Sequence, residues 1–353
     1  MYTKWIYSPR TVISWSRREL LLFTLIAFVP VVLHEVVGLR WLHLPWLPIA
    51  LVGTAVAFLL GFQNNATYGR IWEARKIWGG IVNASRKWGL QLCDFVTNEF
   101  ADEPASEEEL ASLRRRAVMR HVAWLTTLRH ALRQGRPWER SLEHPTNREW
   151  SEWIEVREHR VALEDELVGY LEPEELAEVT SLANPSFHVL RLQSAALREL
   201  RDRSLIDDFR HMEMQGVIQE LLDCQGKSER IKNFPYPRQY ATLHVLYVWI
   251  FVLLIPFGLV YEFDSIRGDL SSDFPRIAAW FPWLSIPFSV VVMWIFHTIE
   301  RIGRTGENPF EGSPNDVPIT TIARGIEIDL RQMLGEPESA LPEPIEARCH
   351  TQS

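Results

Sequence analysis

Four long apolar stretches alternate with polar segments along this chain of 353 residues. Each is about as long as a helix must be to cross about 30 Å of hydrocarbon at 1.5 Å per residue. We therefore expect membrane-spanning helices over residues 20–37, 44–62, 240–260 and 277–296. The second stretch is the most uniform, because about 19 residues from Leu44 to Phe62 carry no charge.

The spacing of the spans predicts two antiparallel membrane hairpins separated by a polar helical block. The block is dense in Arg, Glu, Asp and Lys, and no run of alternating apolar residues favours a sheet, so we expect an all-α fold. The expected organisation is an N-terminal arm (1–19), a first hairpin (20–62), a helical domain (63–236), a second hairpin (237–298), a C-terminal segment (299–336) and a disordered tail (337–353).

Capping residues and apolar spacing predict individual helices within the polar block. Ser106 is followed by three glutamates, a typical helix start, and apolar residues then recur at three- and four-residue steps until Gly135. Further helices are expected over residues 147–171, 185–203 and 207–229.

The distribution of basic residues predicts the orientation in the membrane. The N-terminal arm and the segment after the second span are rich in Lys and Arg, whereas the connection between spans three and four is acidic. Because cytoplasmic flanks carry the excess of Lys and Arg, we expect both termini and the polar block in the cytoplasm of a cell (inner or plasma) membrane, with lipid around the spans. The mean hydropathy of −0.08 is an average over the apolar spans and the polar block.

Several function classes lack the residues that they require. Cys93, Cys224 and Cys349 are too widely spaced for a CxxC metal site or a disulfide framework. His34 and Glu35, at the outer end of the first span, lack the second histidine of a zinc-protease helix, and we expect water to solvate them. There is no phosphate-binding glycine loop, catalytic triad order or long basic stripe. We expect no enzyme activity, cofactor, metal or nucleic-acid partner.

At helical spacing, the second span presents three parallel rows of side chains. One row is small, one contains aromatic residues and one is aliphatic, and they consist of Gly53, Ala57 and Gly61; Thr54, Phe58 and Phe62; and Val52, Val56 and Leu60. Small residues let helices approach closely in lipid. If copies of this helix surround an axis, the aromatic row forms an apolar neck that favours a partly dehydrated anion. Alternatively, these rings pack within one subunit or face lipid.

Three ordered motifs resemble the bestrophin family of ion channels, in particular its bacterial branch. Residues 58–79 read FLLGFQNNATYGRIWEARKIWG, residues 231–240 read IKNFPYPRQY, and residues 307–318 read ENPFEGSPNDVP, followed by IEIDL at 326–330. The resemblance covers residues 1–336. It implies a homopentamer with one axial pore, four membrane helices per subunit and a helical cytoplasmic vestibule.

The resemblance also assigns residues to the pore. Its three-residue neck falls on Thr54, Phe58 and Phe62, where threonine replaces the expected aliphatic residue at the top. The amides Gln63, Asn64 and Asn65 then line the mouth below the neck. A second, cytoplasmic constriction falls on residues 185–203, and its candidates, which otherwise are packing residues, are Val189, Leu190 and Leu192.

Calcium regulation, known for animal relatives, is not expected for this chain. The corresponding segment offers only Glu307, Glu311 and Asp316, separated by Gly and Pro, instead of a run of acidic residues. The sequence thus predicts a homopentameric channel that passively conducts small monovalent anions such as chloride. The alternatives are monovalent cation conduction, which the net charge of −8 leaves open, and a membrane scaffold without conductance.

Overall fold

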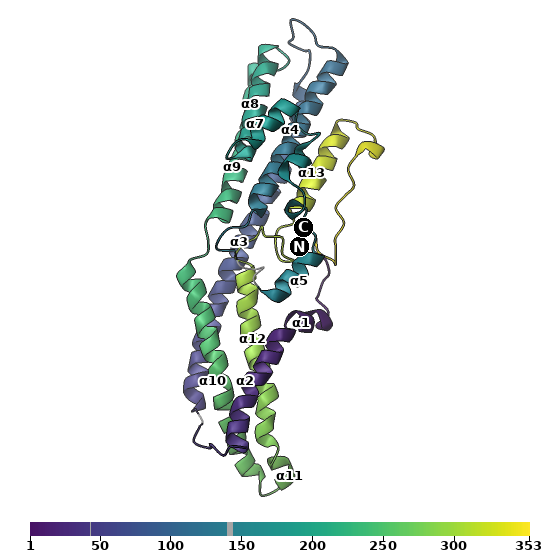
Figure 1. Ribbon diagram of the computed structural model, residues 1–353. Coiled ribbons are helices and arrows are strands. Elements are labelled where there is room, and N and C mark those ends of the chain that lie inside the picture. The colour runs from purple at the N-terminus through teal and green to yellow at the C-terminus, as the bar shows by residue number, and fades with distance from the viewer. Residues whose placement is uncertain (43, 140–143) are drawn as a thin grey trace.

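The computed structural model describes residues 1–42, 44–139 and 144–353 as an elongated bundle of helices (Figure 1). Among these residues no β-strand forms, only isolated bridges. The α-helices are α1 Pro9–Trp15, α2 Arg17–Glu35, α3 Trp46–Phe95, α4 Glu107–Arg133, α5 Pro145–Trp153, α6 Leu163–Leu167, α7 Pro173–Thr180, α8 Pro185–Asp202, α9 Asp208–Asn233, α10 Arg238–Leu270, α11 Pro275–Ala278, α12 Ser285–Thr305 and α13 Ile319–Met333.

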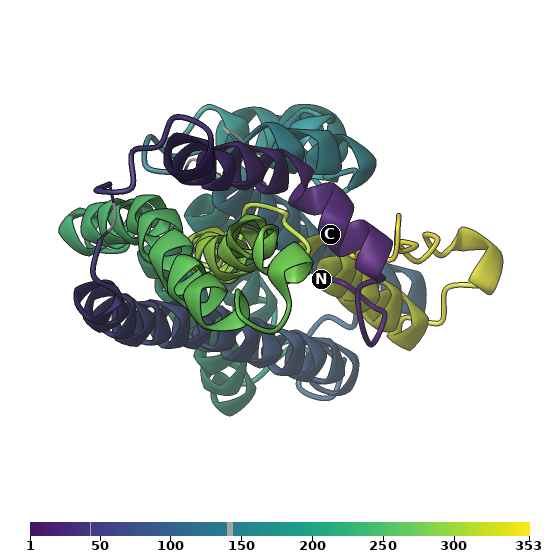
Figure 2. The ribbon, with the colours of Figure 1, turned by 90° about the horizontal axis from the view of Figure 1, so that it is seen from below.

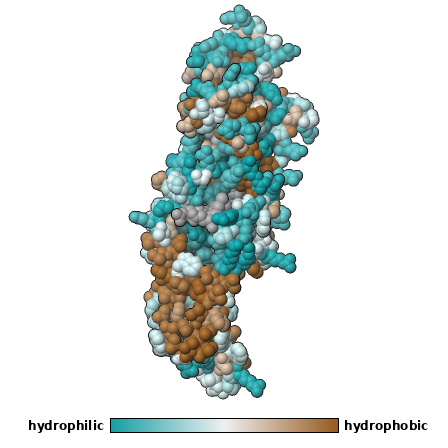
Figure 3. Space-filling view, in the orientation of Figure 1, coloured by the Kyte–Doolittle hydropathy of each residue, from teal (hydrophilic) through white to brown (hydrophobic). Residues whose placement is uncertain are grey.

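One half of the molecule, the apolar half, consists of α2, α10, α12 and the first part of α3. Its interior is a single cluster that includes Phe23, Val56 and Phe251. Its exterior is also apolar, and Figure 3 shows a broad hydrophobic band bounded by hydrophilic surface at both ends. A helix bundle that is apolar inside and outside is suited to lipid.

Three of the described helices are long and apolar enough to cross a membrane: α3, α10 and the segment Phe281–Thr305. The first span that the sequence predicts, now α2, is not among them. Its stretch without Asp, Glu, Lys or Arg runs only from Leu20 to His34, about 22 Å of helix. It nevertheless packs along α12 and α10, and its Phe23 is fully buried in the shared core.

Helices α4 to α9 and α13 form the polar half, α11 lies at the far end of the apolar half, and α3 joins the two halves as one unbroken helix (Figure 1). The sequence predicts a boundary after Phe62, but loss of hydrophobicity does not break a helix, and beyond Pro48 in the first turn no Pro interrupts α3. The second half of α3 packs against α9, α4 and α13 around Trp78, Trp88 and Trp124. The apolar and polar halves are therefore coupled by a continuous rod.

Most of the helices predicted for the polar half are present, with one difference. The helix after Ser106 is confirmed, since the Ser106 hydroxyl accepts a hydrogen bond from the Glu109 N–H at 3.1 Å. The single helix expected over residues 147–171 is wrong, because α5, a 3₁₀ turn and α6 replace it. Residues 337–353, where the sequence predicts disorder, run back along the subunit, and Ser353 accepts a hydrogen bond from the Thr321 N–H.

Candidate ion pathway

The aromatic row of α3 lies on the outer surface of the subunit. Phe58 is 67% exposed and Phe62 is 58% exposed, and their rings meet edge to face with centroids 4.5 Å apart. Thr54, one turn further from the polar half, is also exposed. Its hydroxyl donates to the carbonyl of Ala50 at 2.9 Å, so this hydrogen is used within the helix. Thr54 therefore makes the exposed row less polar than a free hydroxyl group would.

The opposite face of α3 holds the helix in the subunit. Gly53 lies against Phe251 of α10, so closely that a Cβ there would be 2.5 Å from the ring. Val56 and Leu60 are buried in the same core. Because this face is already occupied, Phe58 and Phe62 do not pack within their own subunit, and what covers them lies outside it.

The exposed row continues into the polar half. After Phe62 it passes through Asn65, Tyr68 and Trp72, of which the last two are 62% and 54% exposed. We call the exposed residues Thr54, Phe58, Phe62, Asn65, Tyr68 and Trp72 the α3 stripe. Sequence reasoning missed Tyr68 and Trp72 as members, although steps of three and four residues that lead from Phe62 through Asn65 to them are the signal that places them.

The structure does not bring the three predicted mouth amides together. Gln63 is only 1% exposed and faces Gly303 of α12, so its grouping with the mouth is corrected. Asn64 donates to the carbonyls of Leu60 and Ile299 at 2.9 and 3.2 Å, which ties α3 to α12. Only Asn65 lies on the exposed side.

The predicted cytoplasmic constriction also needs correction. On α8, Val189 and Leu190 are 1% and 4% exposed within the core of the polar half, and Leu192 is half-buried against it. The exposed side of α8 instead carries Phe187 and Arg191. The three candidates are therefore packing residues in the subunit, because helix amphipathicity turns them toward α4 and α9.

The three acidic residues of the segment after α12 have separate partners. Asp316 is buried, and its carboxylate accepts from the backbone N–H groups of Gly312 and Ser313 at 2.7 and 2.8 Å. Burial raises the pKa of Asp316. Glu307 pairs with Arg238 at 3.0 Å, and Glu311 accepts from the Asn308 amide at 2.7 Å. Calcium requires several oxygen atoms that converge on one point, and these carboxylates do not converge.

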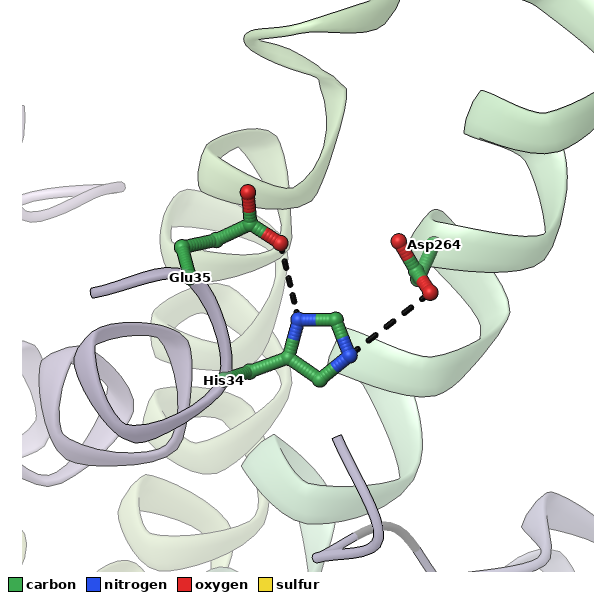
Figure 4. Close-up of side chains that lie close together, drawn as sticks. All are labelled: His34, Glu35 and Asp264. Carbon is green, nitrogen blue, oxygen red and sulfur yellow. Dashed lines mark hydrogen bonds and ion pairs between the residues drawn. The ribbon is translucent and has the colours of Figure 1, made fainter. Parts of the chain in front are cut away.

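A compact polar cluster lies where α2 and α10 end, at the pole far from the polar half (Figure 4). His34 is only 3% exposed, and its ring stands between Glu35, at 2.8 Å, and Asp264, at 3.6 Å. Arg267 pairs with both carboxylates. One ring nitrogen of His34 and one oxygen from each carboxylate lie within 4.8 Å of one another, close enough to hold a metal ion. The two carboxylates, however, face opposite ring nitrogens of His34. The cluster thus links α2 and α10 through ion pairs. The sequence-based expectation that water solvates His34 is wrong, because the side chain is buried.

The end-on view separates the two sides of the apolar half. Figure 2 shows α2 on one side of the bundle and α3 on the other, with α10 and α12 between them. A stripe of aromatic side chains on α3 is therefore remote from α2. Fold and surface together define a membrane protein made of helices, in which the helix that presents this stripe also supports the polar half.

Comparison with known proteins identifies the family. The model for the family described as "Bacterial/Fungal Bestrophin protein" matches residues 8–332. The chain belongs to the bestrophin family, which comprises ion channels and not enzymes.

Similar proteins agree with this assignment. The "voltage-dependent anion channel-forming protein YneE" of Escherichia coli K12 is 28% identical over 291 residues, which cover 82% of this chain and 77% of that protein. A protein of the same description from Ralstonia nicotianae is 29% identical over 306 residues, or 84% and 82% of the two chains. The crystal structure of a bestrophin homologue from Klebsiella pneumoniae matches with a TM-score of 0.69 and 24% identity, covering 91% of this chain and 99% of that one, and supports the fold.

Proposed function

We propose that the chain forms a homopentameric anion channel in which the α3 stripe lines the axial pore. The observation that carries this proposal is the exposure of Phe58 and Phe62 on a helix whose opposite face is fully packed. The description of its relatives as anion channel-forming proteins supports anions as the permeating species. Chloride is the small monovalent anion that we assign.

The chemistry of the stripe suits an anion that passes partly dehydrated. Rings of Phe58 and Phe62 around an axis give a narrow apolar neck, which can gate by dewetting. The edge of an aromatic ring carries partial positive charge, so rings that turn their edges to the axis stabilise an anion. Asn65, with amide donors, follows at the end of the neck that leads to the polar half.

The orientation follows from charge and from the position of the termini. Met1 and Ser353 both belong to the polar half, where Tyr2 and Thr351 form a β-bridge. Arg75 and Lys76, where α3 enters that half, are exposed. With basic residues on the cytoplasmic side, the polar half forms a cytoplasmic vestibule below an inner membrane, and α2 completes four spans per subunit.

Planar-bilayer recording of the purified protein tests this proposal. With asymmetric potassium chloride, we expect single-channel currents whose reversal potential lies near the equilibrium potential of chloride. A reversal potential near that of potassium would contradict anion selectivity and favour the cation channel, which the acidic net charge of −8 allows. Absence of current from correctly assembled protein would refute both and favour a scaffold.

A further inference from the structure

A cavity of about 370 Å³ opens at the junction of the two halves, on a part of the surface formed by elements other than α3. It lies between α1, α5, the last two turns of α12 and the loop 311–315. Its volume is within the range of small-molecule sites. Neither the α3 stripe nor any residue of the proposed pore lines it.

One end of the cavity is formed by α1 and by α12, which belongs to a segment long and apolar enough to cross a membrane. Val12 of α1 and Thr298 and Ile302 of α12 line this end. Ile302 is 46% exposed and follows Ile295 and Ile299, which are also exposed, in one row along α12. A groove that opens into a lipid-facing row is filled by what surrounds that row, which in a membrane is hydrocarbon.

The other end offers hydrogen-bond donors. The indole N–H of Trp150 is buried and has no hydrogen-bond partner among the described residues. Tyr7 lies beside it, with ring centroids 6.4 Å apart. Burial raises the pKa of Tyr7 to about 12, so its hydroxyl keeps its proton. A buried donor without a partner is costly, and an oxygen atom from a ligand would satisfy it.

The charged residues around this end are of both signs. Arg160 lines the cavity and pairs with Glu155 at 2.6 Å. Its side chain is 53% exposed. The carboxylate there, Glu311, is engaged by the Asn308 amide. The cavity thus has an apolar end in the membrane band and a donor-rich end at the polar boundary, as an amphiphile requires.

We propose that this cavity binds the acyl chain of a membrane lipid, with the chain along Ile302 and an oxygen of its head group accepting the Trp150 N–H. Fatty acids and glycerolipids share this chemistry, an alkyl chain that ends in a carboxylate or ester. The site ties the interfacial helix α1 to α12, and it is independent of whether the protein conducts.

Photolabelling of the full-length protein in nanodiscs tests the site. The probes are palmitic acid and phosphatidylglycerol that carry a diazirine in the chain, followed by peptide mapping. We expect labelling by at least one probe to concentrate on α1, α5 and the end of α12. Preference between the probes identifies whether the source is a free acid or a phospholipid. Uniform labelling of the hydrophobic band, or labelling confined to other helices, would overturn the proposal.

Two cavity-filling variants and one control sharpen the result. Val12→Trp and Thr298→Trp, from opposite walls, should each reduce labelling of α5 at least fivefold, whereas Ile299→Trp, on the band outside the cavity, should not. If one filling variant does not fold, the other carries the test. Trp150→Phe should weaken binding of the carboxylate probe about tenfold, the effect of losing a charge-assisted hydrogen bond. Unchanged labelling in the filling variants, or unchanged affinity in Trp150→Phe, would contradict the assignment.

Discussion

A single buried arginine, Arg301, holds together three segments at the junction of the halves. Its side chain is 1% exposed, and it donates to Glu19 of α2 at 2.8 Å and to Asn147 of α5 at 2.8 Å. The guanidinium also lies 3.8 Å from the ring centroid of Trp15. The His144 ring bridges to the same Glu19 carboxylate at 2.7 Å. Among the described residues, Glu19 is the carboxylate that forms an ion pair with Arg301.

Neutralising that carboxylate should destabilise the junction strongly. Glu19→Gln keeps the size of the side chain but leaves the Arg301 charge buried, which costs about 3 to 5 kcal/mol of unfolding free energy. Arg301→Gln removes the opposite partner and the cation–π contact, at a similar cost. In the double variant neither charge remains, so the loss should be smaller than the sum by at least about 2 kcal/mol.

Unfolding of the detergent-solubilised protein by SDS, followed by tryptophan fluorescence, measures these free energies. The matched control is Arg230→Gln, because Arg230 and its partner Glu73, 2.9 Å apart, are both exposed, at 65% and 44% of their side chains, so its loss should cost less than about 1 kcal/mol. Strict additivity of Glu19→Gln and Arg301→Gln, or an equal cost for Arg230→Gln, would refute the reasoning.

Two further predictions concern packing and pH. Gly53→Ala should cost about 1 to 3 kcal/mol through its clash with Phe251, whereas Gly61→Ala, with open space at its Cβ, should stay within about 0.5 kcal/mol; equal costs would contradict the orientation of α3. His121 is buried, and desolvation lowers its pKa to about 3, so the unfolded chain binds its proton first as pH falls below about 6.5. Stability should therefore drop by about 2 kcal/mol from pH 7 to pH 5, as denaturation curves at each pH would show, and His121→Gln should reduce this dependence; an unchanged slope would exclude His121 as its cause.

Local sequence signals were sufficient to predict a helix where a capping residue and a helical spacing of apolar residues occur together. Ser106 and Asn184 both accept from the N–H three residues on, and the helices after them begin where the sequence predicts. The segment after α5 fails for a physical reason: Ile154 and Val156 are both buried although they are two residues apart. A helix cannot place such a pair on one face, so the chain is not helical there.

The candidate ion pathway also could be predicted only in part from the sequence. The exposure of Phe58 could not be decided from spacing, because any row of a helix can be the buried one. Gln63 could have been placed, since it follows Val56 and Leu60 at helical spacing and shares their burial. The partners of Arg301 could not, because they lie on α2 and α5, far away in the sequence.

The central claim is that the exposed rings of α3 form the neck of the pore. Single-channel recording of the variant with both Phe58→Ala and Phe62→Ala tests it most directly, beside Phe28→Ala, which removes a 46% exposed ring from α2 on the opposite side of the bundle. A wider neck should raise the conductance or the open probability of the double variant and leave Phe28→Ala unchanged. Unchanged currents in the double variant, or equal changes in both, would contradict the account.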